Sequence, residues 1–231
     1  MAVGFRATST GYRAELDAHE RRLLSTLCAD VIQLLEARAQ EVASSADDLP
    51  SPEDVPEAGQ EAAPGEDALF AHFRAELAGL GEEESLETPA DPVVRRLLPD
   101  ASEDEEEAGQ FRRLSEGSLR EAKIADLRAA RMWLESSPIR ISDDQAPVLG
   151  RALNDLRLTL AVRLGIEDES DAEKVHRTAM DSRAKDAESF MAEVYTFITW
   201  LQETLFSAML QHLPEDGGPS ADHDGGQEGG R

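Results

Sequence analysis

The chain has 231 residues and a formal net charge of −25, from 48 acidic and 23 basic side chains. This charge excludes nucleic acid and anionic membrane surfaces as partners, because both are bound through clustered Lys and Arg side chains. The single cysteine, Cys28, cannot form an internal disulfide, and no apolar run is long enough for a transmembrane helix. The N-terminus lacks the basic and apolar regions of a signal peptide, so we expect a cytoplasmic protein.

The N-terminal segment, residues 1–43, is predicted to form a small β-hairpin and a long helix. Apolar side chains alternate loosely over residues 5–16 around a Ser-Thr-Gly turn, which is typical of a hairpin. Asp17 and Glu20 then form a D-x-x-E capping box, in which each side chain accepts a hydrogen bond from a free N–H group at the helix start. Leucines and valines follow at helical spacing, so the helix is expected over residues 17–43.

Acidic segments interrupt and end the helical part of the chain. Residues 44–66 contain four prolines and seven acids but no basic residue. Such a segment buries too little apolar area to offset its chain entropy, so it is expected to be a disordered linker. Residues 67–213 are expected to supply the helical remainder of the same domain, and residues 214–231 a disordered tail. Residues 81–90 are read as a second acidic linker.

A short amphipathic helix is predicted between these linkers, over residues 69–80. Its leucines and phenylalanines recur at helical spacing. The helix either docks on the core or serves as a linear motif for a partner.

Two arginine pairs, Arg95-Arg96 and Arg112-Arg113, flank a run of acidic residues. Asp91 and Pro92 are predicted to begin a short helix that ends near Leu98. A capping box of Ser102 and Glu105 predicts a second short helix, so that each arginine pair lies in the last turn of a helix. Cations in that position stabilise a helix by roughly 0.3–1 kcal/mol, because they oppose the negative end of the helix dipole. The alternative function of these arginines is an anion-binding site.

Helix and strand signals alternate in the middle of the chain. Ser115 or Ser118 is predicted to cap a helix that ends near Glu135, and residues 139–141 form a candidate strand that would pair with the hairpin. The helix expected over residues 143–165 is apolar on two opposite sides, and such a helix is usually buried. We therefore expect it to be the central helix of the fold.

Arg163 lies beside the leucine stripe of this central helix. An unpaired buried charge is strongly disfavoured. Arg163 is therefore expected to be buried and paired with a carboxylate from another segment.

The last helix, expected over residues 185–212, has the strongest periodic pattern in the chain. Residues 168–184 either extend this helix at its N-terminus or form a loop. Tyr195, Trp200 and Phe206 point away from its main stripe, with Trp200 expected to be buried and Phe206 exposed. These aromatics indicate either a second layer of packing or a contact surface such as a homodimer interface. The main stripe comprises Phe190, Val194, Phe197, Ile198, Leu201, Leu205 and Ala208.

The sequence contains no recognisable catalytic or cofactor pattern. The five histidines are scattered, and no H-E-x-x-H, paired cysteines, P-loop, G-x-G-x-x-G or G-x-S-x-G occurs. We therefore expect no metal and no cofactor. Cys28 falls on the inner side of a helix and is expected to be a small core residue rather than a nucleophile.

Polar side chains on otherwise apolar helices, together with the second arginine pair, form the candidate site. One interpretation is a buried hydrogen-bond network that fixes how the helices align. The other is an interaction surface. The candidate residues are Arg112, Arg113, Asn154, Asp155, Arg157, Arg163, Gln202 and Glu203.

Four motifs carry a resemblance to a known family: DPVVRRLLPD, QFRRLSEGSLREAK, ALNDLRLTLAVRLGI and LQETL, in this order. They resemble an actinobacterial family, a domain of unknown function, that is typically encoded beside the adaptor that delivers substrates to the Clp protease. The resemblance covers most of residues 5–212, although Gly117 stands where the family pattern has proline. It implies no catalytic residues, and through gene context it implies a link to regulated proteolysis.

These features predict a mainly α (α+β) fold, a single helical domain of about five or six helices with a small N-terminal β-hairpin. The leading function is a non-enzymatic regulatory or adaptor protein that binds an unidentified protein partner through its helices. One alternative is an acidic mimic of nucleic acid that occupies a basic protein surface. The other is an enzyme with an unrecognised site.

Overall fold

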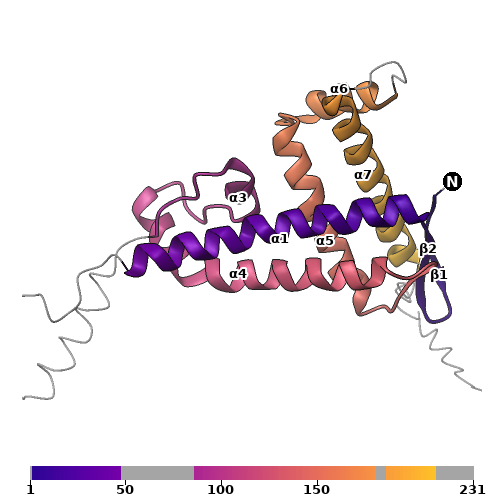
Figure 1. Cartoon of the computed structure of the whole chain (residues 1–231), viewed down its shortest axis with the longest axis horizontal. Coiled ribbons are helices and arrows are strands. Elements are labelled where there is room, and N and C mark those ends of the chain that lie inside the picture. Colours follow the sequence, from indigo (N-terminus) through magenta and orange to yellow (C-terminus); the bar gives the residue numbers. More distant parts are fainter. Residues whose placement is uncertain (1, 48–85, 181–185, 212–231) are drawn as a thin grey trace, which may run out of the picture.

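The computed structural model describes residues 2–47, 86–180 and 186–211 (Figure 1). These residues form six helices and one three-stranded antiparallel sheet, which confirms the predicted mainly helical α+β fold. The predicted helix over 69–80 and the tail lie outside the described residues. The elements are β1 (Val3–Thr8), β2 (Gly11–Glu15), α1 (Ala18–Asp47), α3 (Pro92–Leu97), α4 (Glu105–Leu134), β3 (Ile139–Ile141), α5 (Gln145–Arg163), α6 (Glu169–Met180) and α7 (Ala187–Gln211).

The predicted hairpin is present, and residues 139–141 pair with it as expected. The strand order is β1-β2-β3, with both pairs antiparallel. Gly11, the first residue of β2, has a φ of 121°, and a Cβ there would overlap the carbonyl oxygen of Ile141. Only glycine meets both conditions without strain, so this residue allows the tight turn to lie close against β3.

Helix α1 begins with the predicted capping box. Asp17 Oδ1 accepts hydrogen bonds from the N–H groups of His19 at 2.7 Å and Glu20 at 2.9 Å, and Glu20 Oε2 accepts one from the Asp17 N–H at 2.7 Å. The helix continues to Asp47, one turn beyond its predicted end. The last turn of α1 therefore occupies residues that the sequence assigned to the linker.

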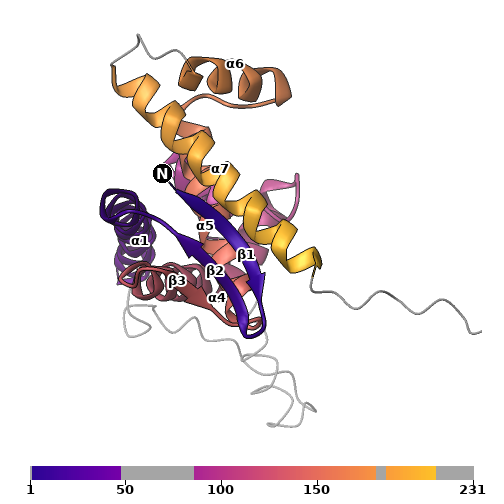
Figure 2. The same cartoon turned by 90° about the vertical axis from the view of Figure 1, so that its right-hand side faces the viewer.

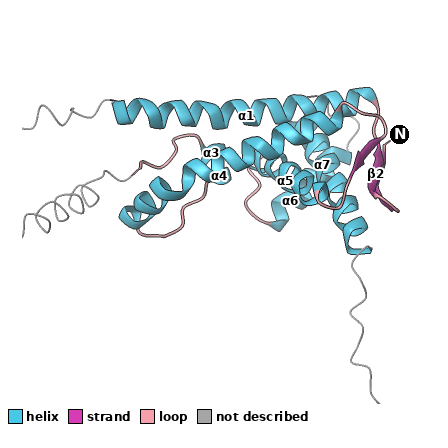
Figure 3. Cartoon of the chain, turned by 90° about the horizontal axis from the view of Figure 1, so that it is seen from below, coloured by secondary structure: helices cyan, strands magenta, loops and turns pink. Residues whose placement is uncertain are grey.

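Helix α4 is one long helix where two were predicted. Its cap is Asp104, whose Oδ1 accepts from two backbone N–H groups at 3.0 Å, so the predicted box at Ser102 is wrong. The predicted start at Ser115 or Ser118 is also wrong, because Ser115 Oγ donates back to the Phe111 carbonyl within the helix. Helix α4 packs against α1 along its length, and the two helices run antiparallel side by side (Figures 1 and 3). This tertiary packing outweighs the local signals for two separate helices.

This continuity changes the explanation for the arginine pairs. Arg95 and Arg96 lie in the last turn of α3, as predicted, and Asp91 caps that helix. Arg112 and Arg113 lie inside α4, far from its C-terminus, so the helix-dipole explanation is wrong for them.

Helix α5 is the central helix, as predicted. It packs against α1, α3, α4 and α7. Arg163 is nevertheless exposed, so its predicted burial is wrong. It lies in the last turn of α5, which extends beyond the core, and there its charge opposes the negative end of the helix dipole. The buried leucines of α5 are Leu149, Leu153, Leu156 and Leu160.

Helix α7 crosses the fold beside β1 (Figure 2), and the β1 Phe5 N–H donates to Thr204 Oγ1 of α7 at 3.1 Å. Most of its predicted stripe is buried, but Phe190 is 50% exposed, because Ser189 and Ala192 form the buried side of the first turns of α7. Phe206 is 42% exposed, as expected. Trp200 is half-buried, with its ring centroid 5.9 Å from that of Phe197.

Residues 169–180 form a separate helix, α6, which is neither the extension nor the loop predicted. It packs on α7 and has no buried residue. Residues of α6 line a hollow of about 620 Å³ together with Tyr195 and Trp200 of α7, and Phe206 is not among the lining residues. None of the described helices is both long and apolar enough to cross a membrane.

Candidate interaction site

A cleft of about 750 Å³ opens between α4, α5 and α7, and we name it the α4–α5–α7 cleft. The packing of α5 against α7 brings together side chains that lie almost 50 residues apart in the sequence. Five of the eight predicted site residues line this cleft, namely Asn154, Asp155, Arg157, Gln202 and Glu203.

The contact between α5 and α7 in this cleft depends on one buried hydrogen bond and one glycine. Gln202 is buried and donates from Nε2 to the Gly150 carbonyl at 3.1 Å. A Cβ on Gly150 would lie 2.7 Å from Cε1 of Phe206, so the absence of a side chain lets this ring approach α5 closely. The predicted role of Gln202 in helix register is consistent with this geometry.

Asp155 anchors the opposite wall of the cleft by pairing with α4. Its Oδ1 accepts a hydrogen bond from Lys123 Nζ at 2.7 Å, while the rest of the carboxylate is buried. Burial raises the pKa of Asp155, and the hydrogen bond from Lys123 opposes that change. Lys123 was not among the candidates from sequence, because a lysine on a polar helix face is normally solvated.

A second ion pair joins the same two helices at the rim. Arg151 donates from Nε and Nη2 to the two carboxylate oxygens of Asp126 at 2.6 and 3.0 Å. This bidentate contact raises the pKa of Arg151. Neither residue was among the candidates from sequence, because each side chain alone resembles an ordinary surface charge.

Arg157, unlike Lys123 and Arg151, has no carboxylate partner among the described residues. It is half-buried, and its Nη2 donates to Asn154 Oδ1 at 3.0 Å. Its Nε is buried and has no hydrogen-bond partner among the described residues, and the same is true of the nearby Thr199 Oγ1. Glu203 is exposed at the rim.

Apolar side chains complete the lining of the cleft. Leu119 is 39% exposed and Phe206 is 42% exposed, with Pro147 and Met209 beside them. A concave surface with apolar walls and a few fixed polar groups is typical of binding sites. The geometry is suited to holding side chains of another molecule.

The other three predicted site residues lie elsewhere. Arg112 is buried and donates from Nη1 to the Leu86 carbonyl at 2.5 Å, and it also pairs with Asp100. Arg113 and Arg163 are exposed. Arg112 therefore belongs to a contact that holds the chain after residue 85 against α4.

A buried charge network that the sequence did not predict lies next to this contact. Glu116 accepts from Arg38 Nε at 3.0 Å and from Arg120 Nη1 at 3.0 Å, and Arg38 Nη2 donates to the Glu87 carbonyl at 2.6 Å. The network ties α1 and α4 to residues 86–90, which the sequence assigned to an acidic linker. Arg38 follows the buried Leu35 by three positions, and this spacing on the apolar side of α1 was the available signal.

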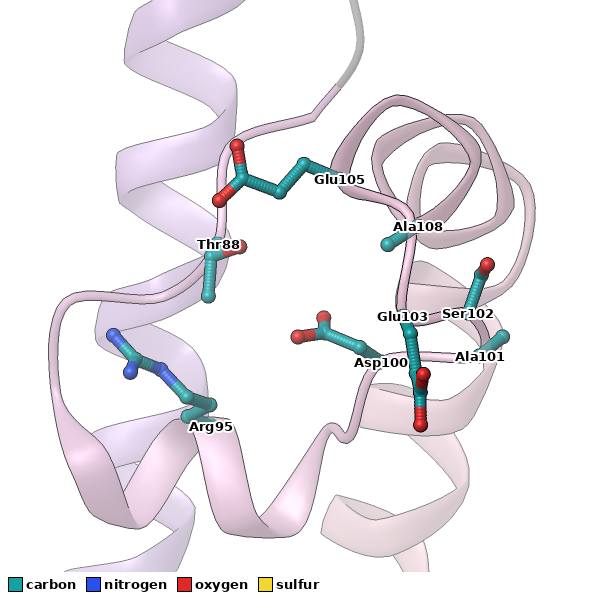
Figure 4. Close-up of a pocket in the computed structure, with 8 residues that line it drawn as sticks. All are labelled: Thr88, Arg95, Asp100, Ala101, Ser102, Glu103, Glu105 and Ala108. Carbon is teal, nitrogen blue, oxygen red and sulfur yellow. The ribbon is translucent and has the colours of Figure 1, made fainter.

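A second hollow, of about 690 Å³, lies between α3 and the start of α4 (Figure 4). Asp100 points into it, opposite Arg95. Both groups already have partners, because Asp100 pairs with Arg112 and Arg95 donates to the Pro89 carbonyl at 3.2 Å. Asp100 and Arg95 thus serve the local fold.

The structure offers no described metal centre or reactive thiol. Among residues 2–47, 86–180 and 186–211, no group of three His, Cys, Asp or Glu side chains could hold a metal ion. Cys28 is buried, and this burial raises the pKa of its thiol to about 12. The prediction that Cys28 is a core residue is confirmed.

The fold is a helical domain with an open, partly apolar cleft. The family model described as Domain of unknown function (DUF2017) matches residues 2–209, and the chain belongs to this family. No curated protein and no solved structure matches the chain.

Proposed function

We propose that this protein is a non-enzymatic regulatory or adaptor protein of the cytoplasm, which binds another protein through the α4–α5–α7 cleft. One observation carries the proposal. Five polar side chains that the sequence predicted as site residues line a single open cleft together with the partly exposed apolar side chains of Leu119 and Phe206.

The composition of the cleft supports a protein partner. Protein interfaces combine an apolar centre with a polar rim, and aromatic side chains and Met are enriched in them. Phe206 and Met209 supply an apolar centre, and the paired charges of Arg151 and Asp126 supply a polar rim. Both ion pairs across α4 and α5 hold the walls in place before a partner arrives, which lowers the entropy lost on binding.

The resemblance to an actinobacterial family encoded beside the Clp adaptor suggests where to search for the partner. We extend the proposal to a role in Clp-dependent proteolysis, supported by that resemblance. A second copy of this chain is the other partner to be tested, because Phe206 is exposed on α7 and flanks the cleft.

Photo-cross-linking in the native host tests the proposal. Benzoylphenylalanine in place of Met209 reports on the cleft, and the same group in place of the exposed Arg22 on α1 is the control. We expect a discrete protein adduct from position 209 that is absent from position 22 and is lost when Phe206→Ser is added. A mass of twice the chain would identify a homodimer.

The proposal fails if positions 209 and 22 give the same adducts, or if Phe206→Ser leaves the adduct unchanged while the circular dichroism spectrum keeps its helical form. The net charge of −25 favours one second candidate, the mimic of nucleic acid. Binding by a mimic would weaken steeply as salt is raised, whereas binding in a partly apolar cleft would change little.

A further inference from the structure

The charged side chains of the α4–α5–α7 cleft are not all paired with one another. Three cationic and three acidic side chains line it, although the whole chain has a net charge of −25. Lys123 pairs with Asp155, and Arg151 pairs with Asp126. Arg157 is the cation of the cleft that has no carboxylate partner among the described residues.

The Arg157 guanidinium has capacity for an acceptor that the protein does not supply. A guanidinium carries five N–H donors. One bond from Nη2, to Asn154, is formed within the described protein, and Nε is buried without a partner. Because Nε is enclosed, the Nη groups are the donors that a ligand can reach, and a carboxylate is the acceptor that binds them best.

The surroundings of Arg157 define the rest of the ligand. Phe206 and Met209 line the same cleft and form its apolar side with Leu119. A ligand that reaches the guanidinium therefore also places apolar groups against these side chains.

We propose that the cleft receives a peptide segment of the partner in which an Asp or Glu side chain is flanked by apolar residues, with the carboxylate bound by Arg157. This inference rests on the function proposed above. The large negative charge of the protein opposes an acidic ligand only weakly at physiological salt, because the Debye length is about 8 Å. Glu203, at the rim of the cleft, acts locally against the same carboxylate and so limits its affinity.

Two tripeptides test the inference on the full chain by nuclear magnetic resonance titration at millimolar concentration. The first is acetyl-Leu-Glu-Leu-amide, and the second carries Gln in place of Glu. We expect the first to shift resonances of the cleft and to bind about tenfold more tightly than the second, because hydrogen bonds between charged groups are worth more than neutral ones.

Variants of the chain identify the group responsible. Arg157→Gln should remove the difference between the two peptides, and Arg157→Lys should retain part of it, because lysine keeps the charge but lacks the fork. Arg128→Gln is the control, since Arg128 is an exposed arginine of α4 that pairs with Glu36 and does not line the cleft. Glu203→Gln should strengthen binding of the acidic peptide. Thermal melts verify that each variant folds.

The inference is overturned if the wild-type chain binds neither peptide or binds both equally, or if folded Arg157→Gln still distinguishes them. Failure of this kind together with an adduct specific to position 209 would leave the proposed function intact. If Arg157 distinguishes the Glu peptide from the Gln peptide but no adduct is specific to position 209, the proposed function is contradicted. The carboxylate-binding site at Arg157 would then still stand.

Discussion

Replacement of Glu116 by Gln is the sharpest test of the buried network between α1 and α4. The Glu116 side chain is 1% exposed and accepts hydrogen bonds from Arg38 at 3.0 and 3.3 Å and from Arg120 at 3.0 Å. Glutamine keeps the shape and one acceptor oxygen but removes the negative charge. The buried Arg38 guanidinium then has no counter-charge of comparable burial, because Glu41 is largely exposed.

Removing one partner of a buried ion pair typically costs about 3–5 kcal/mol. Arg38 keeps its hydrogen bond to the Glu87 carbonyl, and Gln keeps one acceptor, so we expect the lower end, about 3 kcal/mol. For a domain of this size each kcal/mol lowers the melting temperature by about 2–4 °C, which gives a decrease of roughly 6–12 °C.

Urea unfolding followed by circular dichroism measures the change in free energy of unfolding. Glu121→Gln, an exposed acid on the same helix, is the control and should change that energy by less than about 0.5 kcal/mol. The triple variant Arg38→Met, Glu116→Leu and Arg120→Met should recover most of the loss, because it removes all three charges of the network and leaves none without a partner. A loss below about 1 kcal/mol for Glu116→Gln would show that solvent reaches the network, and the reasoning from burial would be refuted.

Three further predictions concern single residues. Gly11→Ala should cost roughly 1–3 kcal/mol through strain at positive φ, measured by urea unfolding, and an unchanged midpoint would contradict the described turn. Cys28 should react with Ellman's reagent only after unfolding, because burial raises its pKa to about 12; rapid reaction of the native protein would show that the thiol is accessible. Asp155→Asn should change the free energy of unfolding by less than about 1 kcal/mol at neutral pH, because removing a buried charge offsets the loss of its ion pair with Lys123. Burial raises the pKa of Asp155 in the folded state above its ordinary value of 3.8, so binding a proton there stabilises the folded state. This stabilisation is complete below pH 3.8 and is lost as the pH rises through the folded-state pKa. The cost of Asp155→Asn should therefore shrink with rising pH across that window, and urea unfolding at several pH values would expose a cost that grows instead.

The sequence by itself determined the elements whose signals are local. The hairpin follows from alternation and a glycine in the turn, and the start of α1 from the reciprocal box of Asp17 and Glu20. Apolar periodicity marked α5 as the central helix and most of the buried face of α7. These features were predictable because the groups that satisfy each other lie within a few residues along the chain.

Only the tertiary structure decided the fate of the charged residues. Arg112 is buried because the Leu86 carbonyl and Asp100 lie beside α4, whereas Arg163 is exposed because α5 extends beyond its neighbours. The cleft likewise required α5 and α7 to pack so closely that Gln202 reaches the Gly150 carbonyl. A charge or polar group is stable inside a fold only where distant segments supply its partners, and the pattern along one helix does not specify which segment will arrive there.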